Sequence, residues 1–231
     1  MTKKRLIALV PFKANSERVP GKNFRLLAGK PLFAWIIDTL LAMPEIDEII
    51  VNTDAREKVI AAGLRESGKL RIRDRKPELC GDFTSMNLIL ADDMNDSEAE
   101  WYLMTHVTNP LISAATVRKA IDALSSNEGS HDSLFSVNRF QNRFYTEQCK
   151  PLNHDPANLI RTQDLPPMFE ENSCLYLFSK SSFAKTNARI GQHPMLFETP
   201  KLESVDIDYP DDWALAEALA EYQQRKQGAA E

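Results

Sequence analysis

The feature that most constrains the fold is a short apolar run that leads directly into a long basic loop and then into a helix. Residues 6–11 form an unbroken apolar run, which is typical of a strand buried on both faces of a parallel sheet. Apolar side chains recur at helical spacing after Pro31, a residue that suits the first turn of a helix. The loop between them must therefore leave the carboxyl end of a strand.

The same alternation continues along the chain. Strands are predicted at residues 46–54 and 101–108, and helices at residues 32–40, 55–68, 84–94 and 114–124, the last capped by Ser113. Residues 131–148, 172–179 and 196–208 are predicted to be strands, so a β-rich insertion is expected at about 131–200. An amphipathic helix follows Pro210. This order predicts an α/β fold with an open, mainly parallel sheet that binds ligands at the carboxyl ends of its strands.

The length and the net charge of the chain limit the classes of protein to which it can belong. A chain of 231 residues with 43% hydrophobic residues is expected to form one globular domain. Its net charge of −5 argues against binding to nucleic acid or to a membrane surface. The first apolar run is too short for a membrane span or a signal peptide, so we expect a cytoplasmic protein. Three cysteines with no metal-ligand spacing are expected to be reduced and structural: Cys80, Cys149 and Cys174.

The loop after the first strand concentrates positive charge in an acidic chain. Its cations are Lys13, Arg18, Lys22, Arg25 and Lys30. Ammonium, guanidinium and backbone N–H groups at the end of a strand can bind a polyphosphate. The loop contains neither GxxxxGK[ST] nor GxGxxG, which argues against a phosphate-loop ATPase and a nicotinamide-cofactor fold. The alternative interpretation is a solvated loop whose cations balance nearby acids.

The segment "VPFKANSERVPGKN" resembles the opening motif of the acylneuraminate cytidylyltransferases, the CMP-sialic acid synthetase family, in which P-A-R-G-G-S-K-x-x-P-G-K-N wraps the triphosphate of CTP. The resemblance continues through "LAGKPLFAWIIDTLL", "IIVNTD", "THVTNPL", "ENSCLYLF" and "VDIDYPDDWALAEAL". It implies a Rossmann-like nucleotidyltransferase fold, in which residues 1–231 form a single cytidylyltransferase domain. It also implies that the insertion at about 131–200 carries part of the sugar site and a dimerisation arm, so a homodimer is expected.

The resemblance assigns the basic loop to the nucleotide. Lys13 stands where the family has an arginine, and Lys22 matches the motif lysine that would clamp the triphosphate. Ala14 and Asn15 replace paired glycines, so the geometry of the loop should differ from that of the family. The expected nucleotide-binding residues are Lys13, Asn15, Ser16, Arg18, Lys22, Asn23 and Arg75, the last lying near the family's "RRPxEL" arginine.

Two carboxylates near the carboxyl terminus are candidates for a metal site. Asp206 and Asp208 are two residues apart, which on a strand directs both side chains to one face. Two carboxylates facing a triphosphate suit Mg²⁺, and the resemblance matches the pair to the family's metal-binding aspartates. Lys22, Asp206 and Asp208 are therefore the expected catalytic residues. The alternative is that Asp208 caps the following helix and Asp206 is simply exposed.

The expected sugar site is spread over the second half of the chain. The segment "THVTNPL" is similar to the sialate-type "QPTSPL" rather than to the acidic "GDEP" motif of octulosonate-activating enzymes, with His106 replacing glutamine. His106 would then be a hydrogen-bonding contact to the sugar; the alternative is a structural histidine. Arg143 and Arg189 are further candidates to bind a sugar carboxylate. The expected substrate-binding residues are His106, Asn109, Arg161, Gln163, Asn172 and Tyr176.

With this resemblance, the sequence predicts a Mg²⁺-dependent transfer of CMP from CTP to the anomeric hydroxyl of an acidic keto-sugar, a sialic acid-like nonulosonate, with release of pyrophosphate. Three alternatives stay open at this point. One is activation of an octulosonate by CTP. Another is a nucleotide-sugar glycosyltransferase, because "DID" also fits a D-x-D metal motif. The third is a nucleotide-binding protein without catalytic activity.

Overall fold

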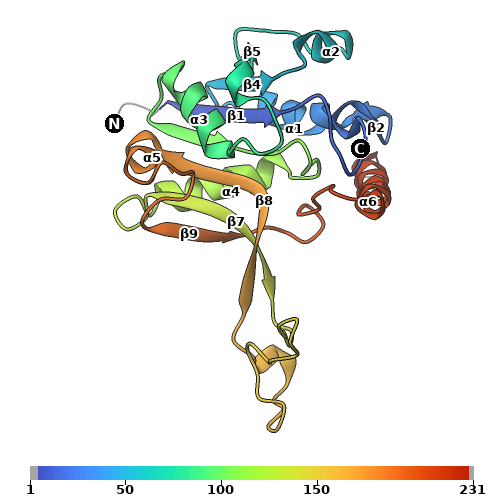
Figure 1. The fold of residues 1–231 in the computed structure, drawn as a ribbon, viewed down its shortest axis with the longest axis vertical. Coiled ribbons are helices and arrows are strands. Elements are labelled where there is room, and N and C mark those ends of the chain that lie inside the picture. The colour runs from blue at the N-terminus through green and yellow to red at the C-terminus, as the bar shows by residue number, and fades with distance from the viewer. Residues whose placement is uncertain (1–4, 229–231) are drawn as a thin grey trace.

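A seven-stranded sheet organises the chain, for which the computed structural model describes residues 5–228 (Figure 1). The strands follow one another across the sheet in the order β5-β4-β1-β6-β8-β7-β9. Their bounds are β1 Leu6–Phe12, β4 Glu48–Thr53, β5 Leu70–Asp74, β6 Trp101–Met104, β7 Ser133–Phe140, β8 Met168–Ser179 and β9 Pro194–Glu198. The pairs β5-β4, β4-β1, β1-β6 and β7-β9 are parallel, while β8 runs antiparallel to both neighbours. The predicted α/β fold with a mainly parallel sheet is confirmed.

Six helices and several short elements complete the described part of the chain. The helices are α1 Leu32–Leu41, α2 Arg56–Ala61, α3 Met86–Asn95, α4 Ala114–Ser125, α5 Lys180–Thr186 and α6 Pro210–Gly228. The short elements are η1 Lys22–Phe24, η2 Pro77–Leu79, η3 Thr162–Asp164 and the two-stranded ribbon of β2 Leu26–Leu27 and β3 Lys30–Pro31. Ser113 caps α4 as predicted, since its hydroxyl accepts a hydrogen bond from the amide of Thr116. Over residues 5–228, no helix combines the length and the apolar character that crossing a membrane requires.

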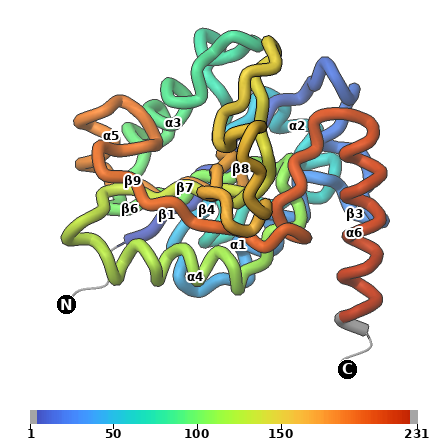
Figure 2. The backbone as a smooth tube through the Cα atoms, turned by 90° about the horizontal axis from the view of Figure 1, so that it is seen from below, coloured from blue at the N-terminus to red at the C-terminus, as the bar shows by residue number. Residues whose placement is uncertain are grey.

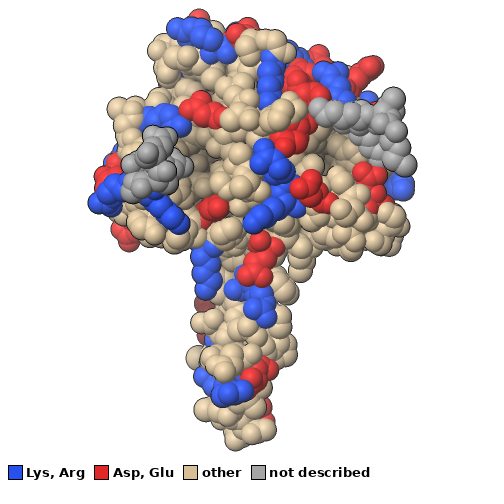
Figure 3. Space-filling view, turned by 180° about the vertical axis from the view of Figure 1, so that it is seen from behind, with Lys and Arg blue, Asp and Glu red and all other residues tan. Residues whose placement is uncertain are grey.

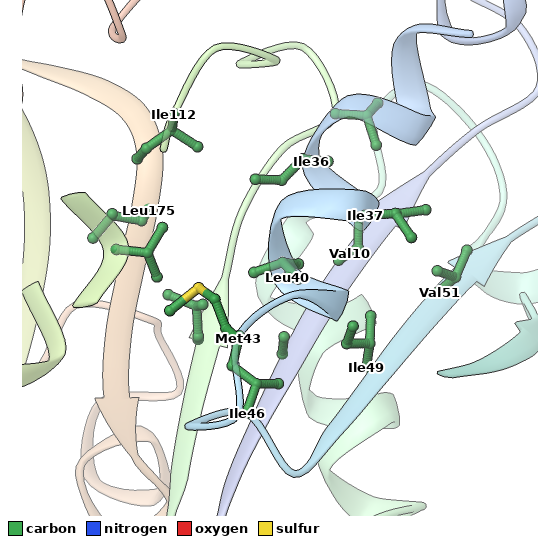
Figure 4. Close-up of a cluster of buried hydrophobic side chains, with 14 of the residues drawn as sticks. Val10, Ile36, Ile37, Leu40, Met43, Ile46, Ile49, Val51, Ile112 and Leu175 are labelled. Atoms are coloured by element: carbon green, nitrogen blue, oxygen red, sulfur yellow. The ribbon is translucent and has the colours of Figure 1, made fainter. Parts of the chain in front are cut away.

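Alternating side chains on the strands create two cores, one on each face of the sheet. On β1, Ala8 and Val10 lie in the cluster that includes α1, α2 and α4, whereas Ile7 and Leu9 lie in the cluster that includes α3 and α5. Figure 2 shows α1 and α4 on one side of the strands and α3 and α5 on the other. Figure 4 shows the first cluster, in which Leu40 of α1 packs among branched side chains from several elements. Both faces of the sheet are therefore covered, as its parallel strands require.

Several elements differ from the sequence predictions. The strands predicted at 101–108 and 131–148 end at Met104 and Phe140. The helix expected at residues 55–68 ends at Ala61, because Gly63 adopts a left-handed conformation (φ +102°) that terminates it. Strand β5 was not predicted, since charged residues interrupt its short apolar pattern. Helix α5 follows β8 without a loop and was also missed. Residues 204–208 form neither a helix nor a strand, so only the start of the strand predicted at 196–208 forms, as the end of β9.

The β-rich region contributes to the central sheet and to a projecting arm. Strands β7, β8 and β9 extend the sheet beyond β6, while residues 141–167 continue from β7 and β8 away from the body (Figure 1). Seen from behind, the arm carries both positive and negative side chains among uncharged surface (Figure 3). It also exposes large apolar side chains, among them Tyr145, Leu152 and Leu159. An arm of this kind buries little within its own chain.

The topology fixes where a ligand can bind. From β1 the chain builds β4 and β5 on one side, and then crosses to β6 on the other side of β1. After β1 and after β6, the chain therefore leaves the sheet in loops that run in opposite directions. A crevice at such a switch point is the usual ligand site of an open parallel sheet.

We predict that Leu40→Ala lowers the free energy of unfolding by about 2–5 kcal/mol, because it leaves a cavity between α1 and the sheet. Leu40 is fully buried (0% exposed), whereas its neighbour Leu41 is 37% exposed. Leu41→Ala is the matched control and should change stability by less than about 1 kcal/mol. Urea unfolding followed by circular dichroism measures both. Equal losses in the two variants would contradict the described packing of α1.

Candidate functional site

A cleft of roughly 370 Å³ lies at this switch point. Its walls are the loop after β1, the segment 81–89 that leads into α3, and the residues after β6. All of the residues that the sequence assigned to a nucleotide line it: Lys13, Asn15, Ser16, Arg18, Lys22, Asn23 and Arg75. His106 and Thr108 line the same cleft from the β6 side. The structure therefore brings together residues that are up to 95 positions apart in the chain.

The basic loop is held in shape by its own polar groups. The side-chain amide of Asn23 donates to the carbonyl of Lys13 (2.8 Å), which closes the loop on itself. The amide of Ala14 donates to Asp54 at the end of β4 (2.6 Å). Gly21 is left-handed (φ +65°) and starts η1, a conformation that favours glycine. These contacts fix the backbone while the cationic ends of the loop stay directed at the cleft.

Arg75 supports the floor of the cleft. Its guanidinium donates to the side-chain oxygen of Asn52 (2.8 Å), to the carbonyl of Asn52 (3.0 Å) and to the carbonyl of Phe12 (3.2 Å). Asn52 in turn donates to Asp93 of α3 (2.6 Å), and Arg73 donates to the same carboxylate (2.8 Å). This buried network joins β1, β4, β5 and α3 behind the loop. Sequence reasoning found Arg75 but missed Asn52, Arg73 and Asp93, which no motif marks.

The two aspartates approach the loop from the far end of the chain. Ile207, which lies between them, is fully buried, and its amide donates to the carbonyl of Thr108 (2.9 Å). Asp208 receives an ion pair from Arg18 (3.0 Å) and another from Lys22 (3.1 Å). Lys22, only 8% exposed, also donates to the carbonyl of Ile207. One buried ammonium group thus joins the basic loop to the segment that carries both carboxylates.

Asp206 is the more buried of the two carboxylates. Within the described residues, its Oδ1 atom is buried and has no hydrogen-bond partner. Burial raises the pKa of Asp206, a hydrogen bond with the Thr108 side chain opposes this increase, and the negative charge of Asp208 adds to it. The two aspartates therefore lie within electrostatic reach of each other. An unpartnered carboxylate oxygen of this kind can accept a cation or a proton.

The capping role considered for Asp208 falls to another residue. Asp212, in the first turn of α6, accepts hydrogen bonds from the amide of Asp208 (2.9 Å) and from that of Tyr209 (2.7 Å). The side chain of Asp208 instead pairs with Arg18 and Lys22. The alternative in which Asp208 caps α6 is therefore wrong.

A second ion pair crosses the mouth of the cleft. Lys13 donates to Asp82, and this contact lowers the pKa of the Asp82 carboxyl group. Glu17 lies near the same pair and stands where the family motif has a lysine. Arg18 supplies a cation one position later, and its guanidinium lies over the ring of Tyr209 (5.0 Å). The prediction from the motif did not include this difference, in which position 17 carries a negative charge and position 18 a positive one.

His106 sits beside a partly buried arginine on the other side of the cleft. A terminal guanidinium nitrogen of Arg189, Nη1, lies 3.4 Å from Nε2 of His106. Burial lowers the pKa of His106 to about 3, with a further contribution from the positive charge of Arg189. The same guanidinium donates to the hydroxyl of Tyr176 (2.9 Å) and lies over its ring (3.7 Å). His106 is therefore a neutral imidazole near pH 7.

Asn109 and Asn172 lie behind this wall rather than on it. Asn109 is fully buried and donates to the carbonyls of Asn172 (3.3 Å) and Val205 (3.4 Å). Asn172 donates to Thr199 (2.6 Å) and to Asn138 (3.0 Å). The two amides join β8 to the segment before Asp206, so in this arrangement they position the site from behind.

The remaining candidates lie on the arm, away from the cleft of their own chain (Figure 1). Arg161 pairs with Asp164 at 2.7 and 3.0 Å. The carbonyl of Gln163 accepts from Gln141 (3.1 Å), and Arg143 donates to the carbonyl of Ile160 (2.7 Å). The structure does not bring these three side chains together with His106 and the aspartates within one chain.

Comparisons with known proteins agree with this geometry. The chain is 30% identical over 236 residues to the CMP-N,N'-diacetyllegionaminic acid synthase of Legionella pneumophila, covering 95% of this chain and 98% of that one. It is 27% identical to the N-acylneuraminate cytidylyltransferase of Streptococcus agalactiae, covering 90% of this chain and about half (51%) of that enzyme. The fold matches 4-diphosphocytidyl-2C-methyl-D-erythritol synthase from Anaerococcus prevotii with a TM-score of 0.70 at 13% identity, over 95% of this chain and 97% of that one.

A family model decides the assignment. The model described as cytidylyltransferase matches residues 7–230, a span that contains the basic loop, the cleft, the arm and both aspartates. The chain belongs to the cytidylyltransferase family.

Proposed function

We propose that the protein transfers CMP from CTP to the anomeric hydroxyl of a sialic acid-like nonulosonate and releases pyrophosphate. The observation that carries this proposal is the meeting of the basic loop with Asp206 and Asp208 through Lys22, at the switch point of a cytidylyltransferase sheet. The two curated relatives described above are named for enzymes of legionaminic and neuraminic acids, which supports an acidic nine-carbon acceptor.

The nucleotide would occupy the cleft with its triphosphate against the loop. Lys13, Arg18 and Lys22 supply three cations from one short segment, and backbone N–H groups lie between them. Cations held in place before the reaction stabilise the charge that builds on a leaving pyrophosphate. Arg75 would contribute mainly by holding the carboxyl ends of β1 and β4 in position, since most of its donors already bind the protein.

Mg²⁺ fits the pair of aspartates. Asp206 offers a buried oxygen without a partner, and both side chains present the hard oxygen donors that this ion prefers. Mg²⁺ usually needs only one or two carboxylates, because phosphate oxygens and water complete its shell. When bound, the ion would offset charge at the reacting phosphate and lower the pKa of the attacking hydroxyl.

The protein's own residues would contribute alignment and charge. The anomeric oxygen attacks the α-phosphorus, the bond to the bridging oxygen of pyrophosphate breaks, and the hydroxyl proton is released. His106 is not the base in this step, since its lowered pKa leaves it a very weak one. It would act as a hydrogen-bonding contact to the sugar, while Lys22 keeps Asp208 in place beside the phosphates.

We propose that the arm forms part of a homodimer interface. Its exposed apolar side chains, Tyr145, Leu152 and Leu159 among them, would be buried against a second copy, and Arg161 and Gln163 would reach the partner's cleft. Arg161 then supplies a bidentate partner for the sugar carboxylate. A cytoplasmic location remains part of this proposal.

We predict that Asp208→Asn lowers the turnover number by at least about 100-fold, because the site loses a carboxylate that faces the reacting phosphate. Pyrophosphate release from CTP and a nonulosonate measures the loss. Asp211→Asn is the matched control, since Asp211 is exposed in the first turn of α6, and it should keep turnover within about twofold. Near wild-type turnover in a folded Asp208→Asn enzyme would refute the proposed reaction centre.

We predict that Asp82→Asn lowers the KM for CTP by about two- to fivefold at low salt, because Asp82 competes with the triphosphate for Lys13. The effect should fade as added salt screens the exposed pair. Glu78→Gln removes a nearby exposed negative charge that does not contact Lys13, and it should leave this KM unchanged. A higher KM in Asp82→Asn would mean that Asp82 helps to bind the nucleotide.

We predict that two inactive variants restore activity when mixed as dimers. Arg161→Ala removes the arm's proposed partner for the sugar carboxylate, and Asp208→Asn removes a carboxylate from the cleft. If the arm acts on the partner, a mixed dimer has one intact site, so random exchange of equal amounts should recover about a quarter of the wild-type activity. Refolding the two variants together and separately, followed by pyrophosphate release, measures this. No recovery on mixing would place Arg161 in its own chain's site, and an active Arg161→Ala enzyme would place it outside the reaction.

A further inference from the structure

We infer that Arg189 is a positioning residue that fixes His106 as the tautomer with its proton on Nδ1, so that His106 is a hydrogen-bond donor to the sugar. This inference rests on the proposed function for the identity of the acceptor. The tautomer itself rests on the geometry of one chain and can be tested without any substrate.

The chemistry of arginine sets the direction of this hydrogen bond. A guanidinium group carries only N–H donors and stays protonated at any ordinary pH. Nη1 of Arg189 lies 3.4 Å from Nε2 of His106, so Nε2 must be the acceptor in this contact. In a neutral imidazole the proton then resides on Nδ1. A proton on Nε2 would instead place two N–H groups head to head.

Arg189 is held firmly enough to impose this choice. Its guanidinium donates to the hydroxyl of Tyr176 (2.9 Å) and pairs with Glu171 (3.4 Å). The Tyr176 hydroxyl donates onward to Glu171, and burial raises the pKa of Tyr176 to about 12, so it stays protonated. The chain of contacts therefore runs from Glu171 through Tyr176 and Arg189 to His106. Nη1 of Arg189 also lies 3.6 Å from the sulfur of Met104, and the Tyr176 hydroxyl lies 3.4 Å from that of Ser173. The guanidinium has only donors, so its contact with His106 keeps the same direction.

The free edge of the ring lies at the cleft. His106 lines the cleft, and over residues 5–228 its Nδ1 atom makes no hydrogen bond to the protein. An N–H group in this place selects for an acceptor on the substrate, such as a carboxylate, a carbonyl or a hydroxyl oxygen. A substrate group that can only donate, such as an ammonium group, would be rejected there.

Some of the charged groups around His106 also favour the neutral imidazole, and the others are too weak to convert it to an imidazolium ion. Arg189 and Lys22 are positive and disfavour an imidazolium ion, whereas Asp208 is the negative group that favours it. Glu171 is already engaged by Tyr176 and Arg189, so its charge is largely balanced before it reaches the ring. Removing Arg189 should therefore change both the tautomer and the titration of His106.

The direct test is a long-range ¹H–¹⁵N spectrum of the imidazole rings in the full chain. The sequence has four histidines, and His106→Leu identifies the signals of His106 by their loss. We expect an Nδ1–H tautomer that does not titrate between about pH 5 and 8. In Arg189→Met, His106 should titrate in that range or move to the Nε2–H form. Arg189→Lys keeps a cationic donor and should retain more of the Nδ1–H form.

The kinetic test uses the same variants. Arg189→Met should raise the KM for the sugar about tenfold or more and leave the KM for CTP within about twofold, because only one donor to the sugar is lost. In a His106→Leu background, Arg189→Met should add less than about a twofold change, since its effect passes through the ring. Arg139→Met, at an exposed arginine on β7, is the matched control and should change neither constant.

The outcomes separate this inference from the proposed function. An Nε2–H or freely titrating His106 in the wild-type protein would overturn the inference while leaving the reaction intact. Full additivity of the two substitutions would also overturn it, because Arg189 would then act on the sugar by another route. A wild-type protein with the Nδ1–H tautomer but no turnover with any nonulosonate would count against the proposed function alone.

Discussion

The site depends on one buried contact between the two ends of the chain. Lys22 and Asp208 are 186 residues apart, and Lys22 reaches both the carboxylate of Asp208 and the carbonyl of Ile207. The buried side chain of Ile207 and its backbone bond to Thr108 keep this segment against the end of β6. Without that anchor, the aspartates would lie on a flexible connection before α6, and the basic loop would have no partner. The reaction centre is thus assembled by packing as much as by charge.

Charge balance explains how an acidic protein holds such a basic loop. Asp208 pairs with both Arg18 and Lys22 on one side, while Asp82 pairs with Lys13 on the other. The cations are therefore stabilised in the folded protein before any ligand arrives. An incoming triphosphate would exchange the contact of Lys13 with Asp82 for its own oxygens, so part of its binding free energy is spent on replacing Asp82. Glu17 adds a negative charge at the mouth and should sharpen this competition.

Much of the fold and of the nucleotide site could be predicted from the sequence, because both are encoded locally. The buried strand β1, the loop after it and the helix α1 are contiguous, and the loop residues that were assigned to a nucleotide all line one cleft. The sugar side was harder to predict, since its geometry depends on long-range packing. Asn109 and Asn172 match motif positions yet serve as buried supports, whereas Arg189 reaches His106 from a loop that carries no motif. Strand β5 was missed because two arginines interrupt its apolar pattern: Arg73 donates to Asp93, and Arg71 pairs with Glu48 and Asp96.

The most direct test of the account is pyrophosphate release from CTP and Mg²⁺ across a panel of nonulosonates and octulosonates. The account predicts release that requires one or more nonulosonates, and a product in which CMP is joined to the anomeric oxygen. Release with octulosonates alone would assign the enzyme to a different acceptor. Tight CTP binding without release for any sugar in the panel would contradict the proposed activity.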